Sequence, residues 1–142
     1  MLDEKVLRYV DRLESEWEEH GKIIIGLDFD DTIFPWKIED FDFDSVIRTI
    51  KMAKETGAYI VIFTASKVER YPEIIKFCES KDIEIDGINE PPIETEYGNL
   101  GKMFANIYID DRAGLHESLE ILTLAMYRIR GKRTSKFNET LK

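Results

Sequence analysis

Lys22-Ile-Ile-Ile-Gly-Leu-Asp28 is a short, unbroken apolar run that ends in an acidic residue. A run of this kind is typical of a strand that is buried on both faces of a parallel sheet. It is followed at once by Phe29-Asp30-Asp31-Thr32, which adds two carboxylates and a hydroxyl. The stretch over 22–32 therefore predicts a central strand with an acidic loop at its carboxyl end.

Helical and strand patterns alternate around this stretch. A helix is predicted over 3–19, because Val6, Val10, Leu13 and Trp17 recur at helical spacing. The other predicted elements are a helix over 43–57, a strand over 59–63, a helix over 72–81 with Ile74, Ile75 and Cys78 inward, a short strand around 83–88, a strand over 106–109 and a helix from about 115 onward. Such alternation predicts an α/β, Rossmann-like fold with a mostly parallel central sheet flanked by helices.

Length and charge limit the class of protein. The 142 residues fit a single domain over 1–142, with an N-terminal helix over 1–20 and a basic, flexible tail over 131–142. The net charge of −9 argues against general nucleic-acid binding, and the tail is expected to be solvated rather than bound to a phosphate chain. With one cysteine and no long apolar run, we expect a cytoplasmic protein without a membrane segment.

Polar residues follow the predicted strands, where ligands bind in open parallel sheets. Asp28 and Asp30 come after the first strand, Thr64 after the second, and Asp110 with Asp111 after the last, while Lys102 lies just before the last strand. Each of these residues alone could be an ordinary helix cap. Together, however, they would place several carboxylates at one edge, and such carboxylates repel each other by roughly 4 kcal/mol per pair at 4 Å unless a cation is present. Oxygen ligands of this kind suit Mg²⁺.

These residues carry a resemblance to the haloacid dehalogenase-like (HAD) hydrolase superfamily. Asp28-Phe-Asp-Asp-Thr32 resembles its first motif, Thr64 its second, Lys102 its third, and Asp110-Asp111 the acidic pair of its fourth. Ser66 competes with Thr64, and Lys67 with Lys102. Asp31 departs from the pattern, because many members carry glycine at this position.

The resemblance implies a Mg²⁺-dependent phosphomonoester hydrolase with an aspartyl-phosphate intermediate. It makes Asp28 the nucleophile and Asp30 the general acid and base, while Thr64 and Lys102 hold the phosphoryl group. The metal ligands would be Asp28, the backbone carbonyl of Asp30 and Asp110, with Asp111 acting through water or by orienting Lys102.

The substrate is less well defined by the sequence. Neither 33–57 nor 66–101 leaves room for the cap domain that many HAD proteins insert, so we expect an open site. Such a site suits a small phosphorylated substrate, with a nucleotide monophosphate as one candidate, a phosphorylated macromolecule, or closure by a partner subunit. Phe34-Pro35-Trp36 could pack against the next helix or contact substrate, and Asn89 could serve in a turn or face the site. The apolar stripe of the first helix could cover a sheet face or form a homodimer surface.

Three other functions are considered. A response-regulator receiver also combines acidic residues, a Thr or Ser and a Lys around Mg²⁺, but their order along this chain does not fit. A catalytically idle phosphate- or metal-binding module of the same fold would keep the site without turnover. A phosphotransferase would pass the phosphoryl group to an alcohol rather than to water.

Overall fold

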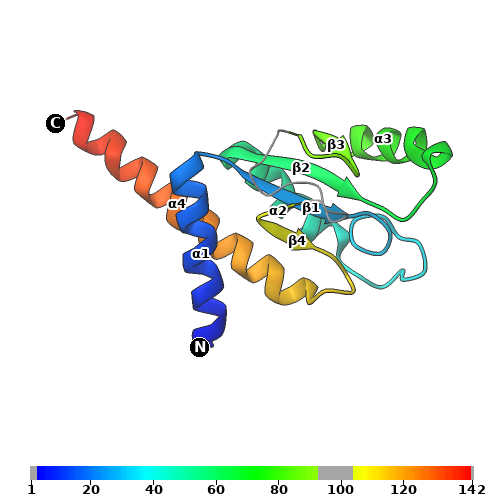
Figure 1. The fold of residues 1–142 in the computed structure, drawn as a ribbon, viewed down its shortest axis with the longest axis horizontal. Coiled ribbons are helices and arrows are strands. Elements are labelled where there is room, and N and C mark those ends of the chain that lie inside the picture. The colour runs from blue at the N-terminus through cyan, green and yellow to red at the C-terminus, as the bar shows by residue number, and fades with distance from the viewer. Residues whose placement is uncertain (1–2, 93–103, 142) are drawn as a thin grey trace.

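The computed structural model describes residues 3–92 and 104–141. Its centre is a four-stranded sheet in the order β3-β2-β1-β4, and all of its neighbouring strands are parallel (Figure 1). The strands are β1 (Ile23–Asp28), β2 (Ala58–Phe63), β3 (Gly87–Ile88) and β4 (Ile107–Ile109). The expected α/β fold with a parallel central sheet is therefore confirmed, although β3 is shorter than the predicted strand around 83–88.

In the described part of the chain, four α-helices and one short 3₁₀ helix accompany the sheet. They are α1 (Glu4–His20), α2 (Phe43–Gly57), η1 (Val68–Arg70), α3 (Tyr71–Ser80) and α4 (Leu115–Leu141). Local chemistry explains several ends: Asp3 caps the start of α1, and Gly21 ends it with a left-handed φ of 74°. Pro72 lies in the first turn of α3, where its missing N–H costs nothing.

The main core lies between one face of the sheet and the helices. Alternate residues of β1, namely Ile23, Ile25 and Leu27, join it, and all four α-helices contribute buried side chains. The opposite face of the sheet holds a smaller cluster around Ile24, Val61 and Ala105. Cys78 is buried in the main core as expected, whereas Ile75, predicted to face inward, is 41% exposed. Because Ile74 and Cys78 lie on the same face of α3, the next residue along, Ile75, is turned toward solvent.

The apolar stripe of α1 is covered within the chain. Val6, Val10, Leu13 and Trp17 are buried in the main core, and α1 packs chiefly against α4, which it crosses in Figure 1. The alternative that this stripe forms a homodimer surface is therefore wrong, because α4 already occupies it.

The basic segment at the carboxyl end also differs from expectation. In place of a flexible tail over 131–142, α4 continues to Leu141. Lys132 donates to Glu18 of α1 at 2.6 Å, and Arg133 donates to the Thr56 carbonyl of α2 at 2.6 Å. These contacts with two other helices explain why the chain stays helical past Gly131. Within the described residues, no helix is long and apolar enough to cross a membrane.

Candidate functional site

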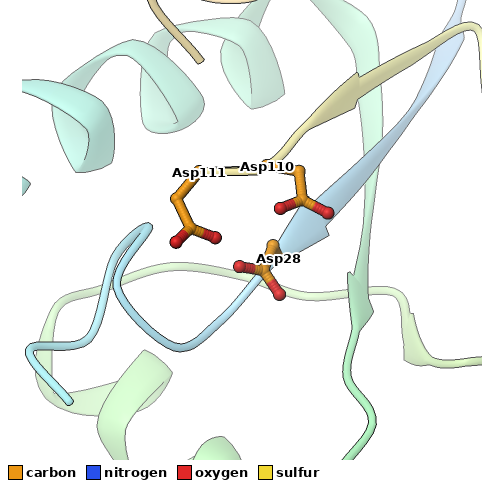
Figure 2. Close-up of side chains that lie close together, drawn as sticks. All are labelled: Asp28, Asp110 and Asp111. Carbon is orange, nitrogen blue, oxygen red and sulfur yellow. The ribbon is translucent and has the colours of Figure 1, made fainter. Parts of the chain in front are cut away.

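Three carboxylates meet at the carboxyl edge of the sheet. Asp28 is the last residue of β1, and Asp110 and Asp111 directly follow β4, which pairs with β1 through Leu27 and Ile109. One oxygen from each carboxylate lies within 4.8 Å of the others. Figure 2 shows the three side chains turned toward one another from these two strand ends. The parallel pairing of β1 with β4 therefore brings together residues more than eighty positions apart.

Thr32 connects the two halves of this cluster. Its hydroxyl donates to Asp28 Oδ2 at 2.9 Å and accepts from the Asp111 backbone N–H at 3.0 Å. The Thr32 side chain is fully buried, so water cannot compete for these bonds. Thr32 thus ties the loop after β1 to the end of β4.

Asp28 has an unusual affinity for protons. Burial, followed by its hydrogen bond with Asp111, raises the pKa of Asp28 to about 7, and the nearby Asp110 charge acts in the same direction. The Thr32 hydroxyl opposes this change, because it donates to the ionised form. The raised pKa indicates that the charged form of Asp28 is disfavoured, first by burial and then by its acidic neighbours, and a bound cation would favour that charged form.

Asp30 lies beside this cluster but is paired with a different group. Its two carboxylate oxygens accept from Arg70 Nη1 at 2.6 Å and from Arg70 Nη2 at 2.7 Å. The Arg70 guanidinium also donates to the Ser66 hydroxyl at 2.8 Å. The two-pronged pairing raises the pKa of Arg70 above its usual range. The Asp30 carboxylate is therefore held by an arginine at the end of η1, the 3₁₀ helix that follows β2.

Aromatic side chains support this arginine. The Arg70 guanidinium carbon lies 4.7 Å from the centre of the Trp36 ring and 5.4 Å from that of Phe29. Phe34 stacks on Phe29 with ring centres 5.0 Å apart. Phe34 packs against the main core, but its ring contacts are with Phe29 and with Phe77 of α3 rather than with the next helix, α2. Trp36 remains 57% exposed.

The backbone conformation at Asp31 explains why aspartate can replace the glycine that is common at this position. Its φ of 58° lies in the left-handed region, which glycine adopts freely and which aspartate tolerates better than most residues. Its Oδ1 accepts from the backbone N–H groups of Trp36, Lys37 and Ile38 at 2.8–3.0 Å. These bonds lower the pKa of Asp31 and fix the loop that follows β1.

Thr64 is placed by Asn89, which follows β3. The Thr64 backbone N–H donates to Asn89 Oδ1 at 3.0 Å, and Asn89 Nδ2 donates back to the Thr64 carbonyl at 2.8 Å. The Thr64 hydroxyl accepts from the Ser66 N–H at 3.0 Å. Asn89 has a φ of 56°, in the left-handed region that asparagine tolerates, and its side chain joins the end of β3 to the end of β2.

The remaining candidates differ in what the structure says of them. Lys102 lies outside the described residues. Lys67, its competitor, is exposed at the start of η1. Ser66, the competitor of Thr64, has its hydroxyl engaged with Arg70. The structure thus brings Asp28, Asp110 and Asp111 together and places the Asp30 carboxylate on Arg70.

Sequence reasoning missed Arg70 and the bridging role of Thr32. Arg70 gives no signal of its own, because it is one of many charged residues in a segment without a motif. Thr32 belonged to the quoted motif, and its spacing of four from Asp28 could have indicated that it turns back toward the strand end. Comparison with protein-family models, with curated proteins and with solved structures found no match.

Proposed function

We propose that this protein is a Mg²⁺-dependent phosphomonoester hydrolase of the HAD type, with Asp28 as the nucleophile. The observation that carries the proposal is the convergence of Asp28, Asp110 and Asp111 at the carboxyl edge of a parallel sheet, with Asp30 two residues beyond the nucleophile. Open parallel sheets bind their ligands at this edge.

The donor set fits a hard divalent cation. Three carboxylates offer oxygen atoms within 4.8 Å of one another, and Asp28 has a pKa raised to about 7 by burial and by its acidic neighbours. Asp28 and Asp110 would hold the ion directly, together with the backbone carbonyl of Asp30, and Asp111 would act through water. When bound, Mg²⁺ would neutralise negative charge on the transferring phosphoryl group.

The chain's own residues would divide the reaction into two steps. A carboxylate oxygen of Asp28 would form a bond to phosphorus while the ester P–O bond breaks. Asp30 would give a proton to the leaving oxygen, for which it must first leave Arg70 and take up a proton, because the two-pronged pair favours its ionised form. Water then attacks the aspartyl-phosphate, Asp30 takes a proton from that water, and inorganic phosphate leaves. Thr64 and Lys102 would hold the phosphoryl oxygens, as the HAD resemblance implies.

The segment between Thr32 and β2 is too short to form a cap over the site, which suits either a small phosphorylated substrate or a phosphorylated macromolecule. Between Thr32 and β2, the chain holds only the Asp31-anchored loop and α2. Nothing in that segment would cover a bulky substrate.

Hydrolysis of 4-nitrophenyl phosphate tests the proposal. We expect turnover by the wild type that EDTA abolishes, that Mg²⁺ restores and that Asp28→Asn removes. Asp11→Asn is the matched control, because Asp11 is an exposed carboxylate of α1 paired with Arg128, away from the strand ends.

A calorimetric titration with Mg²⁺ separates the other outcomes. Cation binding that requires Asp28, without hydrolysis of any ester in a panel of phosphomonoesters, would favour the idle binding module. Transfer to an added alcohol in place of water would favour a phosphotransferase. Absence of both binding and hydrolysis would refute the proposal.

A further inference from the structure

Asn89 makes more hydrogen bonds than its exposed position requires. Its backbone N–H donates to the Ile62 carbonyl of β2 at 2.8 Å. Its side chain is exposed, yet it makes two bonds with Thr64, and Asn89 Nδ2 also donates to Tyr71 Oη at 3.0 Å. Water could satisfy an exposed amide equally well. The three side-chain bonds therefore indicate that Asn89 places its neighbours rather than satisfying buried groups.

The two bonds to Thr64 continue the pairing of β2 with β3 beyond the strands. That pairing ends at Ile62 and Ile88, and the backbone turns at Asn89, where φ is 56°. The Thr64 N–H then donates to Asn89 Oδ1 at 3.0 Å, and Asn89 Nδ2 donates to the Thr64 carbonyl at 2.8 Å. One side-chain amide thus holds both backbone polar groups of Thr64, as a neighbouring strand would.

Thr64 lies next to the proposed nucleophile. In the register of β1 with β2, Asp28 is the Cα partner of Phe63, and Thr64 is the next residue along the chain. Neighbouring parallel strands are about 4.8 Å apart, so the Thr64 backbone lies beside the start of the acidic loop. The sheet itself fixes this position only as far as Phe63, which ends β2. The placement of Thr64 therefore depends on the Asn89 side chain.

The Thr64 hydroxyl is arranged as a hydrogen-bond donor. It accepts from the Ser66 backbone N–H at 3.0 Å, which leaves the hydroxyl hydrogen for another partner. Among the described residues, none accepts from this hydroxyl. A phosphoryl oxygen bound at the carboxyl edge of the sheet would be a suitable acceptor.

We propose that Asn89 is the positioning residue for Thr64: its amide holds the Thr64 backbone so that the Thr64 hydroxyl meets a phosphoryl oxygen of the substrate. This inference rests on the proposed function, in which Thr64 holds that oxygen. A displacement of about 1 Å can lower a rate roughly 100-fold. Asn89 itself touches no substrate and acts only through Thr64.

Hydrolysis of 4-nitrophenyl phosphate by Thr64→Val, Asn89→Gly and the double variant tests this assignment. Thr64→Val keeps the shape of the side chain and removes the hydroxyl. Asn89→Gly removes the amide, and glycine adopts the left-handed φ of this position without strain. The bonds between Asn89 and Thr64 are exposed, so the freed backbone groups can bond to water and the variant should fold.

The double variant distinguishes positioning from a structural role. We expect kcat/KM to fall about 100-fold in Thr64→Val and about tenfold in Asn89→Gly. The double variant should be no slower than Thr64→Val, because Asn89 acts only through the hydroxyl that is already absent. A purely structural role of Asn89 would instead lower kcat/KM by the same factor in both backgrounds. The inhibition constant of orthovanadate, which resembles the transferring phosphoryl group, should rise in the same pattern.

The affinity for Mg²⁺ checks that the cation site is intact. The proposed carboxylate ligands, Asp28 and Asp110, come from β1 and β4, and Asn89 bonds to neither of them. We therefore expect the Kd for Mg²⁺, measured by calorimetry, to change less than about twofold in Asn89→Gly.

Asn89→Asp serves as the test if Asn89→Gly does not fold. Its carboxylate can still accept from the Thr64 N–H but cannot donate to the Thr64 carbonyl. Its added charge acts in both backgrounds, so only the difference between the backgrounds reports on positioning. We expect kcat/KM to fall about threefold more when Thr64 is present than in the Thr64→Val background.

Asn106→Ala is the matched control. Asn106 also bridges two segments through its amide: Oδ1 accepts from the Ile24 N–H at 2.6 Å, and Nδ2 donates to Glu16 at 3.4 Å. It lies at the opposite edge of the sheet, where β1 and β4 begin. We expect Asn106→Ala to keep kcat/KM within about twofold of the wild type.

The outcomes separate the two proposals. If the wild type shows no Asp28-dependent hydrolysis, the proposed function falls and this inference falls with it. If hydrolysis is present but Asn89→Gly has no effect, or lowers kcat/KM equally with and without the Thr64 hydroxyl, only this inference is overturned. A Thr64→Val variant as active as the wild type would overturn it too, because the hydroxyl that Asn89 positions would hold nothing.

Discussion

Replacing Asp28 with asparagine should make the metal-free protein more stable. Asparagine has the same shape as aspartate, and its carbonyl can still accept from Thr32 while its amide can donate to Asp111, with which Asp28 shares a hydrogen bond. The substitution removes one of three negative charges whose oxygens lie within 4.8 Å of each other. At an effective dielectric of 20, each such pair repels by about 3 kcal/mol. The proposed nucleophile would thus be held at a cost in stability.

The pKa of Asp28 sets the size of this gain. A rise from 3.8 to about 7 corresponds to roughly 4 kcal/mol between the two protonation states. Asp28 is partly open to water, so solvent screening reduces this figure, and we expect about 2 kcal/mol at pH 8. The sign follows from proton binding: between pH 4 and 7 the folded protein holds a proton that the unfolded chain has lost. The free energy of unfolding therefore falls as the pH rises through this window.

Urea unfolding in EDTA at pH 3.5 and pH 8 measures the effect. We expect Asp28→Asn to exceed the wild type by about 2 kcal/mol at pH 8 and to lie close to it at about pH 3.5, where Asp28 is protonated in the unfolded chain as well as in the folded protein. Asp11→Asn should show no such pH dependence. Adding Mg²⁺ at pH 8 should stabilise the wild type more than the variant. If Asp28→Asn lost equal stability at both pH values, the carboxylates would not repel each other in the way described.

Three further predictions concern the frame around the site. In Gly26→Ala, the new methyl group would lie 2.9 Å from Tyr108 Cδ1, so we expect the free energy of unfolding to fall by about 1–3 kcal/mol in urea unfolding, and an unchanged midpoint would contradict that close approach. Asn89→Ala removes both bonds to Thr64, so hydrogen exchange at the Thr64 amide should quicken about tenfold, whereas exchange within α1 should not change. Glu14→Gln weakens the contacts with Arg128 and Lys132 that lower the Glu14 pKa. It should cost less than about 1 kcal/mol at pH 7, and the difference from wild type should vanish as the pH falls below 4.5 and shrink in high salt.

Much of the fold follows from local patterns in the sequence. The continuous apolar run of β1 is typical of a buried strand, and the stripe of α1 repeats at helical spacing. Both elements lie within a residue or two of their predicted bounds. The pattern failed where partners far along the chain decide the structure. Ile83 is buried without belonging to a strand, so burial alone did not make it part of β3. Gly131 and its basic neighbours were predicted to form a flexible tail, yet they belong to α4, where Lys132 and Arg133 contact α1 and α2.

The candidate site divides in the same way. The three clustered carboxylates were predictable, because the carboxyl ends of parallel strands meet at one edge, and β1 happens to pair with β4. The partner of Asp30 was not predictable, since a guanidinium reaches its target through a long side chain from any nearby turn. Arg70 is held next to Asp30 by the Phe29 and Trp36 rings that lie against its guanidinium. Packing of this kind produces no regular spacing of residues that could be recognised in the sequence.

The pairing of α1 with α4 bears on how this chain reaches its folded state during synthesis. Arg128 and its partner Asp11 are 117 residues apart, and the sheet lies between them along the chain. A ribosome makes α1 before the sheet and before α4, so Val10 and Trp17 have no α4 to cover them until the residues of α4 have emerged. Contacts of such long range form slowly, and an exposed apolar stripe is open to aggregation meanwhile. Although α1 precedes the sheet along the chain, it is docked only after α4 has been made, which makes a nascent chain that stops before α4 a natural client of chaperones.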